Sequence, residues 1–342
     1  MILSRTLFER ILHKFHLLPT PLLDSFGSVL YGRALAIAVR RGVFEALETK
    51  PLTVSEIANN TGMTREGVAL LVDAFVVGGY LVRRGDTYGL SAEGAKWLVK
   101  SSPAYLGNLV RYFETLYDRW NYLEHSLEKG QPPRRYYETF GDEDWKVYVL
   151  GMRDLARLLM TQVQKRIALP PHPHSLLDLG GSHGLYAVEC CRRHPTLKAQ
   201  VIDFAEALRH ADSLVREEGM EGRVTLTAGD FLTMELPGNQ DCILAFNIIH
   251  GLSEEENRRL VKLAMNALVP GGKLYILDQI KGEEGRSPLS RFVPLMVGLN
   301  LLNEIGGNTY TFAQVKSWCN GAASVKQYRL RLPGVSLIEV VR

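Results

Sequence analysis

Between residues 175 and 278, five short apolar runs alternate with segments in which apolar residues recur every three or four positions. Short apolar runs are typical of buried parallel strands, and intervening segments such as EENRRLVKLAMNAL are typical of amphipathic helices. This alternation predicts a doubly wound α/β domain. The expected strands cover residues 175–179, 199–203, 223–227, 241–246 and 273–278.

The C-terminal segment has a different pattern. SVKQYRLRL and VSLIEVV flank Pro333 and Gly334, and apolar and polar residues alternate along both. Alternation on either side of a turn pair predicts an antiparallel hairpin. A parallel sheet that ends in such a hairpin is a more specific architecture than a generic Rossmann fold.

The first 50 residues are helical in pattern, with Pro19 and Pro21 interrupting the first segment. A helix with so much apolar surface needs a partner. Because this segment precedes any evident core, we expect the partner to belong to a second copy of the chain.

A helix-turn-helix pattern and a hairpin follow. Thr53 and Glu56 form a capping box for one helix, and a second helix is expected from about 65 to 77. YLVRR and TYGLS, on either side of Gly85-Asp86, predict two short strands. This combination is typical of a winged helix. Its second helix is mostly aliphatic and has few groups able to read bases, which favours a structural or dimerising role over DNA binding.

Residues 101–170 are helical in pattern and rich in aromatic residues, with a loop at 129–135. Aromatic side chains at helical spacing are usually core, so each has only a modest chance of touching a ligand. We therefore divide the chain into an N-terminal winged-helix dimerisation domain (1–100), a helical linker that contributes to a substrate pocket (101–170) and a catalytic domain (171–342).

Charge and cysteine content disfavour several classes of protein. The chain has 40 Lys and Arg against 37 Asp and Glu, a net charge of +3, without a long basic run. A nucleic-acid partner therefore has no support. The four cysteines form no C-x-x-C pair, which favours reduced thiols in the cytoplasm. PHPHS at 171–175 has no Cys or carboxylate nearby, so we expect a linker there and no metal site.

The N-terminus carries Arg5, Glu9 and Arg10 among its apolar residues, unlike a signal peptide. No uncharged apolar run approaches the length that spans a bilayer. We expect a cytoplasmic protein with no membrane span.

A glycine-rich turn follows the first strand of the α/β domain. In LLDLGGSHG, Gly180, Gly181 and Gly184 let the backbone turn sharply and let a ligand approach the next helix. Dinucleotides and S-adenosylmethionine both use such a turn, and a purely structural turn is the alternative.

Acidic residues distinguish between these ligands. Asp203 ends the second strand, 25 positions after Asp178, where a carboxylate can accept both hydrogens of a ribose diol. At the end of the third strand, Asp230 is placed for an adenine amino group and Phe231 for the ring. The ordered set fits an adenosine with a free diol and no phosphates.

With these motifs the chain resembles the S-adenosylmethionine-dependent O-methyltransferases, a family that includes caffeate, acetylserotonin and hydroxyneurosporene-type enzymes. The resemblance covers nearly the whole chain. It implies a class I methyltransferase sheet, Rossmann-like and with a C-terminal antiparallel hairpin, preceded by an α-helical winged-helix dimerisation domain. The matching segments are 178–184, Asp203-Phe204, 229–231, NIIHGLSEEE at 247–256 and LVPGGKLYILD at 268–278.

The resemblance also implies which residues hold the cofactor, S-adenosylmethionine. These are Asp178, Gly180, Gly181, Gly184, Asp203, Phe204, Asp230, Phe231, Phe246 and Asn247. Ser182 stands where the family usually has a third glycine. We expect the loop to tolerate it, provided that the backbone there need not take a positive φ.

His250 matches the general base of the family. It lies just beyond the fourth strand, on the edge where open α/β sheets bind ligands, and histidine accepts protons near neutral pH. The alternative is a histidine that caps the helix beginning at SEEENRRL.

Two acids flank the base in the plant enzymes. One matches Asp278, but Thr309 replaces the other, and Gly251 replaces the aspartate that usually follows the histidine. Asp278 then acts alone, or Glu304 substitutes from nearby. A further alternative is an acceptor that is already acidic or attacks through carbon.

The segment SRFVPLMVGLNLLNE is expected either to roof an acceptor site, with Met152 and Trp120, or to pack as core. We interpret the chain as a homodimeric O-methyltransferase of secondary metabolism that acts on a hydroxyl of a small aromatic or polyketide-like metabolite. The alternatives are a C-methyltransferase, a non-methylating homologue that binds the cofactor, and a winged-helix, ligand-sensing transcription regulator.

Overall fold

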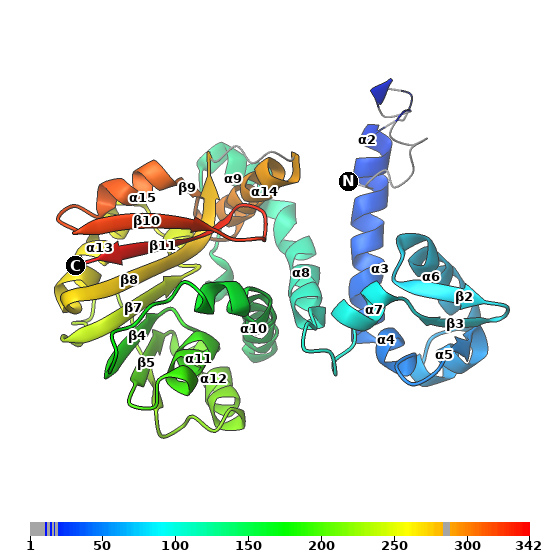
Figure 1. Cartoon of the computed structure of the whole chain (residues 1–342). Coiled ribbons are helices and arrows are strands. Elements are labelled where there is room, and N and C mark those ends of the chain that lie inside the picture. Colours follow the sequence, from blue (N-terminus) through cyan, green and yellow to red (C-terminus); the bar gives the residue numbers. More distant parts are fainter. Residues whose placement is uncertain (1–10, 12–13, 16, 18–19, 283–287) are drawn as a thin grey trace. The chain divides into compact units, whose positions relative to one another are not determined.

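The computed structural model describes residues 11, 14–15, 17, 20–282 and 288–342. Contacts within the chain divide it into two compact units, with the boundary between Leu116 and Tyr117. That boundary falls inside the segment 101–170 that the sequence indicated as a linker. Each unit is described by itself (Figure 1).

The N-terminal unit begins with consecutive helical segments. These are α2 (Thr20–Leu22), the π-helical η1 (Leu23–Gly27), α3 (Ser28–Arg40) and α4 (Val43–Ala46). Pro21 lies within α2, and Pro19 lies outside the described residues. The stretch Thr20–Arg40 is long and apolar enough to cross a membrane by length and composition alone. A single helix near the N-terminus is a weak indication of a span, because ordinary helices of other proteins pass the same test.

The predicted winged helix is present. Its elements are β1 (Leu52–Thr53), α5 (Val54–Thr61), α6 (Arg65–Gly78), β2 (Leu81–Arg84), β3 (Thr87–Leu90) and α7 (Ala92–Trp97). The capping box of α5 forms as expected, since the Glu56 N–H donates to Thr53 Oγ1 and the Thr53 N–H donates to Glu56 Oε2 at 2.7 Å. The three strands form a sheet in the order β1-β3-β2.

The helical middle of the chain follows. It contains α8 (Gly107–Arg119), η2 (Trp120–Tyr122), α9 (Leu123–Lys129), η3 (Tyr136–Glu138) and α10 (Asp142–Gln164). The predicted loop at 129–135 is confirmed between α9 and η3.

The C-terminal unit is built on one mixed sheet, with the strand order β10-β11-β8-β7-β4-β5-β6. All five predicted parallel strands are confirmed, and so is the antiparallel hairpin. The strands are β4 (Ser175–Leu179), β5 (Lys198–Asp203), β6 (Val224–Ala228), β7 (Gln240–Phe246), β8 (Leu268–Lys281), β10 (Ser324–Arg329) and β11 (Val335–Val341). The sequence did not indicate the short β9 (Tyr310–Thr311), which pairs with the end of β8.

Helices cover both faces of the sheet (Figure 1). One hydrophobic core joins the sheet to α10, α11 (Leu185–Arg193) and α12 (Ala205–Glu217). The other joins it to α13 (Glu254–Ala267) and α15 (Phe312–Trp318). The strand β4 pairs with β5 on one side and with β7 on the other, so the strand order reverses there. Ligands of open α/β sheets bind at the carboxyl ends of the strands beside such a reversal.

Candidate active site

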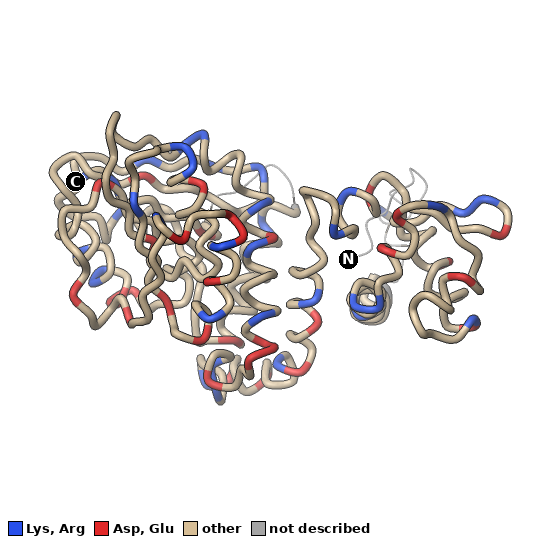
Figure 2. The backbone as a smooth tube through the Cα atoms, turned by 90° about the horizontal axis from the view of Figure 1, so that it is seen from below, with Lys and Arg blue, Asp and Glu red and all other residues tan. Residues whose placement is uncertain are grey.

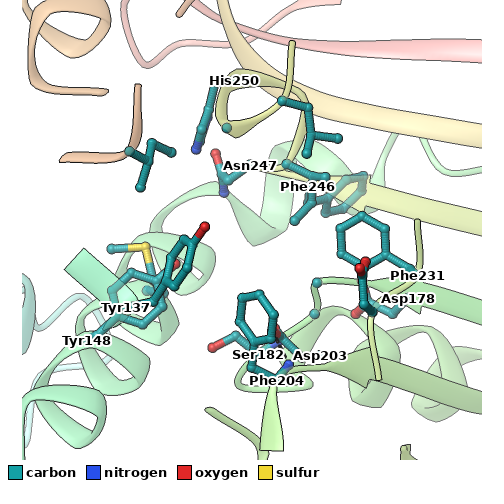
Figure 3. A pocket seen from close by; sticks show the side chains of 18 of the residues that line it. Tyr137, Tyr148, Asp178, Ser182, Asp203, Phe204, Phe231, Phe246, Asn247 and His250 are labelled. Atoms are coloured by element: carbon teal, nitrogen blue, oxygen red, sulfur yellow. Dashed lines mark hydrogen bonds between the residues drawn. The ribbon is translucent and has the colours of Figure 1, made fainter. Parts of the chain in front are cut away.

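A cavity of about 300 Å³ opens at the carboxyl ends of β4, β5 and β7. Figure 3 shows Tyr137 and Tyr148 on one side, facing Asp178 and Phe231, with His250 and Asp203 at opposite ends. The cavity collects most of the expected site residues. Those that line it are Met152, Asp178, Gly180, Gly181, Asp203, Phe204, Asp230, Phe231, Phe246, Asn247 and His250. Gly184, Asp278 and Trp120 are not among the lining residues.

At Gly180 and Gly181 the glycine loop has room for backbone only. Gly180 has a φ of 64°, and a Cβ there would collide with the side chain of Ile248. Gly184 has a φ of 68° where it leads into α11. These positions require glycine, as the sequence indicated.

Ser182 was expected to be tolerated if the backbone there did not take a positive φ, and the structure does not meet this condition. The φ of Ser182 is 41°, so the serine occupies the left-handed region that glycine tolerates best. Its N–H donates to Asp203 Oδ2 at 2.8 Å, which ties the loop to the end of β5. The loop therefore accommodates Ser182 in a strained conformation.

Within the described part of the chain, three buried polar side chains at the cavity have no hydrogen-bond partner. They are the carboxyl group of Asp178, the Ser182 hydroxyl and the Tyr186 hydroxyl. Burial, and then the charge of Asp203, raises the pKa of Asp178 to about 8. An unsatisfied buried polar group costs about 1–3 kcal/mol, so a cluster of them marks a place where a polar ligand can bond. No local pattern in the sequence indicated that Tyr186 would lie at the cavity.

Asp203 is held in a fixed orientation. Its Oδ2 accepts the Ser182 N–H, and its Oδ1 accepts the Phe204 N–H at 2.7 Å. Each oxygen can accept a further hydrogen bond, and part of the carboxylate faces the cavity. Burial raises its pKa to about 6, although the two backbone donors oppose that shift. The carboxylate is placed to accept a pair of hydroxyl groups.

Two residues after β6 complete this end of the cavity. Asp230 is exposed, and its Oδ1 accepts the Leu232 N–H at 2.9 Å. Phe231 is half-buried beside the glycine loop. An exposed carboxylate and an apolar ring fit the amino edge and the face of an adenine.

His183 lies in the glycine loop and lines the cavity, but its ring serves the fold. Its Nδ1 accepts the Leu185 N–H at 3.0 Å and so satisfies a donor in the first turn of α11. Burial lowers the pKa of His183 to about 3, which keeps the ring neutral. We therefore assign it a structural role.

His250 projects into the cavity from the 3₁₀ turn η4 (Ile249–Gly251). Its Nδ1 lies 2.6 Å from Asp278 Oδ1, and Asp278 is completely buried. Asp278 Oδ1 also accepts the Gln279 N–H at 2.8 Å. A carboxylate at Nδ1 holds the proton on that nitrogen, which leaves Nε2 as the acceptor. Helix α13 is capped by Ser253 and Glu256, so the alternative in which His250 caps it is wrong.

Among the hydrogen bonds of the described residues, none joins His250 to Thr309, the position of the second family acid, or to Glu304, its expected substitute. Thr309 is buried, and its hydroxyl donates to the carbonyl oxygen of Pro294 at 3.4 Å. Glu304 is buried in an ion pair with Arg119, whose Nε lies 2.6 Å from its Oε2. Among the described residues, Asp278 is the acid that holds His250.

Aromatic side chains from η3 and α10 form one wall of the cavity. They are Tyr136, Tyr137, Trp145 and Tyr148, and Met152 follows on α10. The ring of Tyr137 lies 5.4 Å from that of Phe204, centroid to centroid. Helix α14 (Pro288–Ile305) contributes Ile305. Trp120 donates its indole N–H to Asn300 Oδ1 at 2.8 Å, which ties η2 to α14.

Comparisons with known proteins agree with this geometry. A family model described as an O-methyltransferase domain matches residues 120–322. The 3-hydroxy-5-methyl-1-naphthoate 3-O-methyltransferase of Streptomyces sahachiroi is 26% identical over 339 residues, covering 93% of each chain. TcmO, the tetracenomycin polyketide synthesis 8-O-methyl transferase of Streptomyces glaucescens, is 29% identical over 85% of this chain and 87% of its own.

A solved structure shares the fold along the whole chain. Human N-acetylserotonin methyltransferase, in complex with S-adenosylmethionine, superposes with a TM-score of 0.81 at 21% identity, covering 100% of this chain and 99% of its own. The family match spans more than half of this sequence and includes the glycine loop, Asp203 and His250. The chain belongs to the family of S-adenosylmethionine-dependent O-methyltransferases.

Proposed function

We propose that the protein methylates a hydroxyl group of a small aromatic or polyketide-like acceptor, with His250 as the general base. The observation that carries this proposal is the His250–Asp278 hydrogen bond at the edge of a cavity that also contains Asp203. A histidine whose Nδ1 is held by a buried carboxylate is suited to take a proton at Nε2.

The polar groups of the cavity fit S-adenosylmethionine. Asp203 would accept the ribose hydroxyls, and Asp230 and Phe231 would hold the adenine. The unpartnered groups of Asp178, Ser182 and Tyr186 would bond the amino-acid part. Gly180 and Gly181 keep side chains out of its path, Gly184 leads into α11, and Phe204, Phe246 and Asn247 would flank the nucleoside.

When bound, the cofactor supplies a methyl group already activated on a sulfonium. The protein then has two tasks, which are to align the acceptor oxygen and to remove its proton. Nε2 of His250 accepts the hydroxyl proton as the oxygen attacks. Asp278 stabilises the imidazolium ion that forms, because its carboxylate is already bonded at Nδ1. General-base catalysis of this kind contributes roughly 10²–10⁴-fold.

The aromatic wall supports a flat acceptor. Tyr136, Tyr137 and Tyr148 present ring faces and edges, and Met152 adds a flexible apolar surface that adapts to the shape of a ligand. The named substrate of the Streptomyces sahachiroi relative is a hydroxynaphthoate, which is a molecule of this class. Trp120 does not line the cavity, and its proposed role is to support α14 through its hydrogen bond to Asn300.

We also infer a cytoplasmic homodimer formed through the N-terminal unit. Three apolar side chains that are at least half exposed lie close together on the consecutive segments η1 and α3. They are Phe26, Val29 and Leu30. On α6, Leu70 and Val77 are exposed at a spacing of two turns. Such stripes favour association with another protein surface. The four buried, unpaired cysteines fit a reducing compartment.

Specific DNA binding receives no support from the charge distribution. Figure 2 shows Lys and Arg interspersed with Asp and Glu in both units. The exposed apolar residues of α6 have no groups that read base edges.

The proposal is tested by incubating the purified protein with S-adenosylmethionine labelled in its methyl group and a panel of hydroxylated aromatics. The panel includes a hydroxynaphthoic acid, a hydroxylated anthraquinone and N-acetylserotonin. We expect at least one methyl ether, identified by mass spectrometry and NMR. A product methylated only at carbon, or cofactor binding without transfer to any phenol of this class, would contradict the proposal.

A further inference from the structure

We propose that Asn257 is a positioning residue, which sets the backbone turn that carries His250. This inference rests on the proposed role of His250 as the general base. It concerns a side chain of α13 that does not line the cavity.

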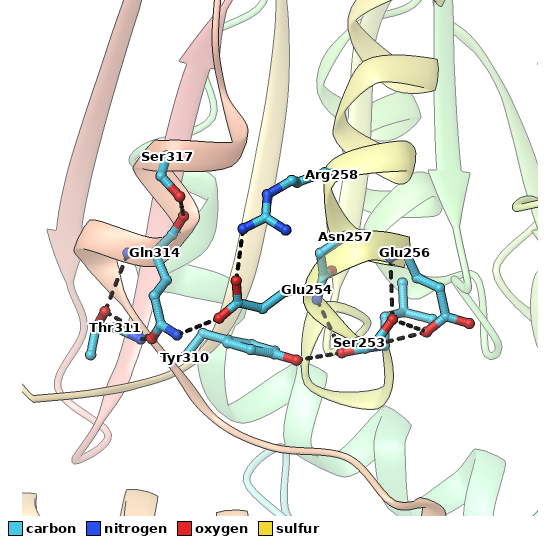
Figure 4. Close-up of polar contacts among 10 residues, drawn as sticks. Ser253, Glu254, Glu256, Asn257, Arg258, Tyr310, Thr311, Gln314 and Ser317 are labelled. Atoms are coloured by element: carbon cyan, nitrogen blue, oxygen red, sulfur yellow. Dashed lines mark hydrogen bonds and ion pairs between the residues drawn. The ribbon is translucent and has the colours of Figure 1, made fainter.

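The amide of Asn257 bridges the turn on both sides of His250. Its Nδ2 donates to the carbonyl oxygen of Ile249 at 2.9 Å and to that of Leu252 at 3.1 Å. Both carbonyl groups belong to the η4 turn or to the residue that follows it. Figure 4 shows Asn257 and Tyr310 reaching this turn just before Ser253.

Two further groups fix the same turn from outside it. The Tyr310 hydroxyl donates to the Leu252 carbonyl oxygen at 2.6 Å, and the Asn308 N–H donates to the His250 carbonyl oxygen at 2.9 Å. The carbonyl groups around His250 are therefore held by α13 and by the segment that enters β9. Asp278 holds the ring and also accepts the His250 N–H at 3.3 Å, whereas Asn257 and its neighbours hold the carbonyl groups of the turn.

Stability alone does not account for an asparagine here. Asn257 is completely buried, and its Oδ1 has no hydrogen-bond partner among the residues that the structure describes. An apolar side chain of similar volume would remove this unsatisfied oxygen, and both carbonyl groups would keep another donor, the Leu252 N–H for Ile249 and the Tyr310 hydroxyl for Leu252. The N-terminus of α13 is already capped by Ser253 and Glu256, so the helix does not need Asn257 as a cap. What the amide adds is a fixed distance between the two ends of the turn.

That fixed distance matters because the base must meet the acceptor oxygen in one geometry. A displacement of about 1 Å at reacting groups can reduce a rate on the order of 10²-fold. Without the two N–H donors of Asn257, fewer hydrogen bonds hold the turn, and a shift of the turn would move the ring out of alignment with Asp278 and with the cavity.

The primary variant is Asn257→Leu, which keeps the volume and removes both donors. We expect kcat to fall by about 10–100-fold, while KM for the acceptor and the affinity for S-adenosylhomocysteine change little. Tyr310→Phe removes one hydrogen bond from the same turn, and we expect a smaller loss in the same direction. If Asn257→Leu does not fold, Tyr310→Phe takes its place as the test variant.

Gln240→Met is the matched control. Gln240 is a buried amide whose Nε2 bridges two backbone carbonyl groups, those of Pro237 and Gly238, at 3.2 Å each. It lies at the opposite end of β7 from the η4 turn. We expect this variant to retain kcat even if its stability falls.

Two readouts separate positioning from general destabilisation. In a His250→Ala background, Asn257→Leu should cause no further loss of rate, because its effect passes through the histidine. In ¹⁵N-histidine NMR spectra without acceptor, wild type and Gln240→Met should show His250 as a single tautomer protonated at Nδ1, and Asn257→Leu should show a mixture. An unchanged tautomer together with an unchanged kcat, or equal losses in Asn257→Leu and Gln240→Met, would overturn the inference.

The failure of the two proposals can be distinguished. If His250→Ala retains the wild-type rate, His250 is not the base, and the role in catalysis inferred for Asn257 falls with it. If His250→Ala is inactive and Asn257→Leu is fully active, the base assignment stands and only the positioning role of Asn257 is wrong.

Discussion

Asp278 Oδ1 lies 2.6 Å from His250 Nδ1, although the two residues are 28 positions apart in the sequence. The histidine follows β7, and the aspartate lies on β8, one residue beyond the Phe246–Leu277 pair that ends the register of these parallel strands. The pairing of β7 with β8 brings the two segments to one edge of the sheet, and the η4 turn then carries the histidine to the aspartate. Because Asn257, Asn308 and Tyr310 hold that turn, the dyad keeps one geometry, which suits a base that must meet a small acceptor.

We expect Asp278→Asn to reduce kcat by roughly 10–10³-fold, because an amide can hold the wrong tautomer of His250 and cannot stabilise its charged form. The affinity for S-adenosylhomocysteine should change little, since Asp278 does not line the cavity. Steady-state kinetics and calorimetry on the same preparation measure both quantities. A parallel loss of affinity and rate would show that the substitution disturbs the sheet and not the base alone.

Cofactor affinity should depend on pH through Asp203. Its pKa is raised to about 6 by burial, and a ribose diol donates to the ionised form. As the pH falls below about 6, the carboxylate takes up a proton and the affinity for S-adenosylhomocysteine should weaken. Calorimetric titrations between pH 5 and pH 8 measure this dependence. Asp203→Asn should bind weakly at every pH, and a wild-type affinity that stays constant across the range would contradict the assignment.

The stability of the ligand-free protein should fall as the pH rises. The pKa values of Asp178 and Asp203 are raised from 3.8 to about 8 and about 6. The folded state therefore keeps protons that the unfolded chain has already released. Their stabilising effect is complete below about pH 4 and is lost as the pH passes through the two raised values. Urea unfolding of Asp178→Asn and wild type at pH 5 and pH 8 tests this, and the variant should lose less stability between the two.

Ser182 should report the strain in the glycine loop. Its φ of 41° is easier for glycine than for a residue with a Cβ. Ser182→Gly should therefore be about 1 kcal/mol more stable than Ser182→Ala, which keeps the strain. Urea unfolding of both variants without ligand measures the difference. Equal stabilities, or a more stable alanine variant, would mean that the loop relaxes around a Cβ.

Much of the fold could be predicted because its signals are local. Five apolar runs between amphipathic helices specify a parallel sheet, and the Thr53–Glu56 capping box specifies a helix start. The His250–Asp278 contact was implied by the family resemblance, and the parallel pairing of β7 with β8 brings the two residues to one edge of the sheet.

The parts that the sequence could not reveal depend on tertiary packing. Tyr136 and Tyr137 look like ordinary core aromatic residues, and only the path of η3 brings them to the cavity. Glu304 was a candidate second acid, but its carboxylate forms an ion pair with Arg119, which is 185 positions away in the sequence. The positive φ of Ser182 follows from the turn that the three neighbouring glycines make. The identity of residue 182 alone does not indicate this backbone conformation.

The exposed apolar stripe of the N-terminal unit should determine the oligomeric state. Phe26→Glu combined with Leu30→Glu places charges on two residues that are 65% and 52% exposed. We expect light scattering after size exclusion to report twice the chain mass for wild type and the single chain mass for the variant. Leu127→Glu, at a 60% exposed position of α9, is the matched control and should stay dimeric. A monomeric wild type would contradict the proposed dimer.

In the proposed mechanism His250 takes the acceptor proton, and binding of the cofactor does not need this histidine. The single-turnover rate of methyl transfer by His250→Ala, measured with saturating cofactor and an acceptor that wild type converts, tests that claim directly. We predict a fall of roughly 10²–10⁴-fold with the affinity for S-adenosylhomocysteine unchanged. A variant that transfers the methyl group at the wild-type rate would contradict it.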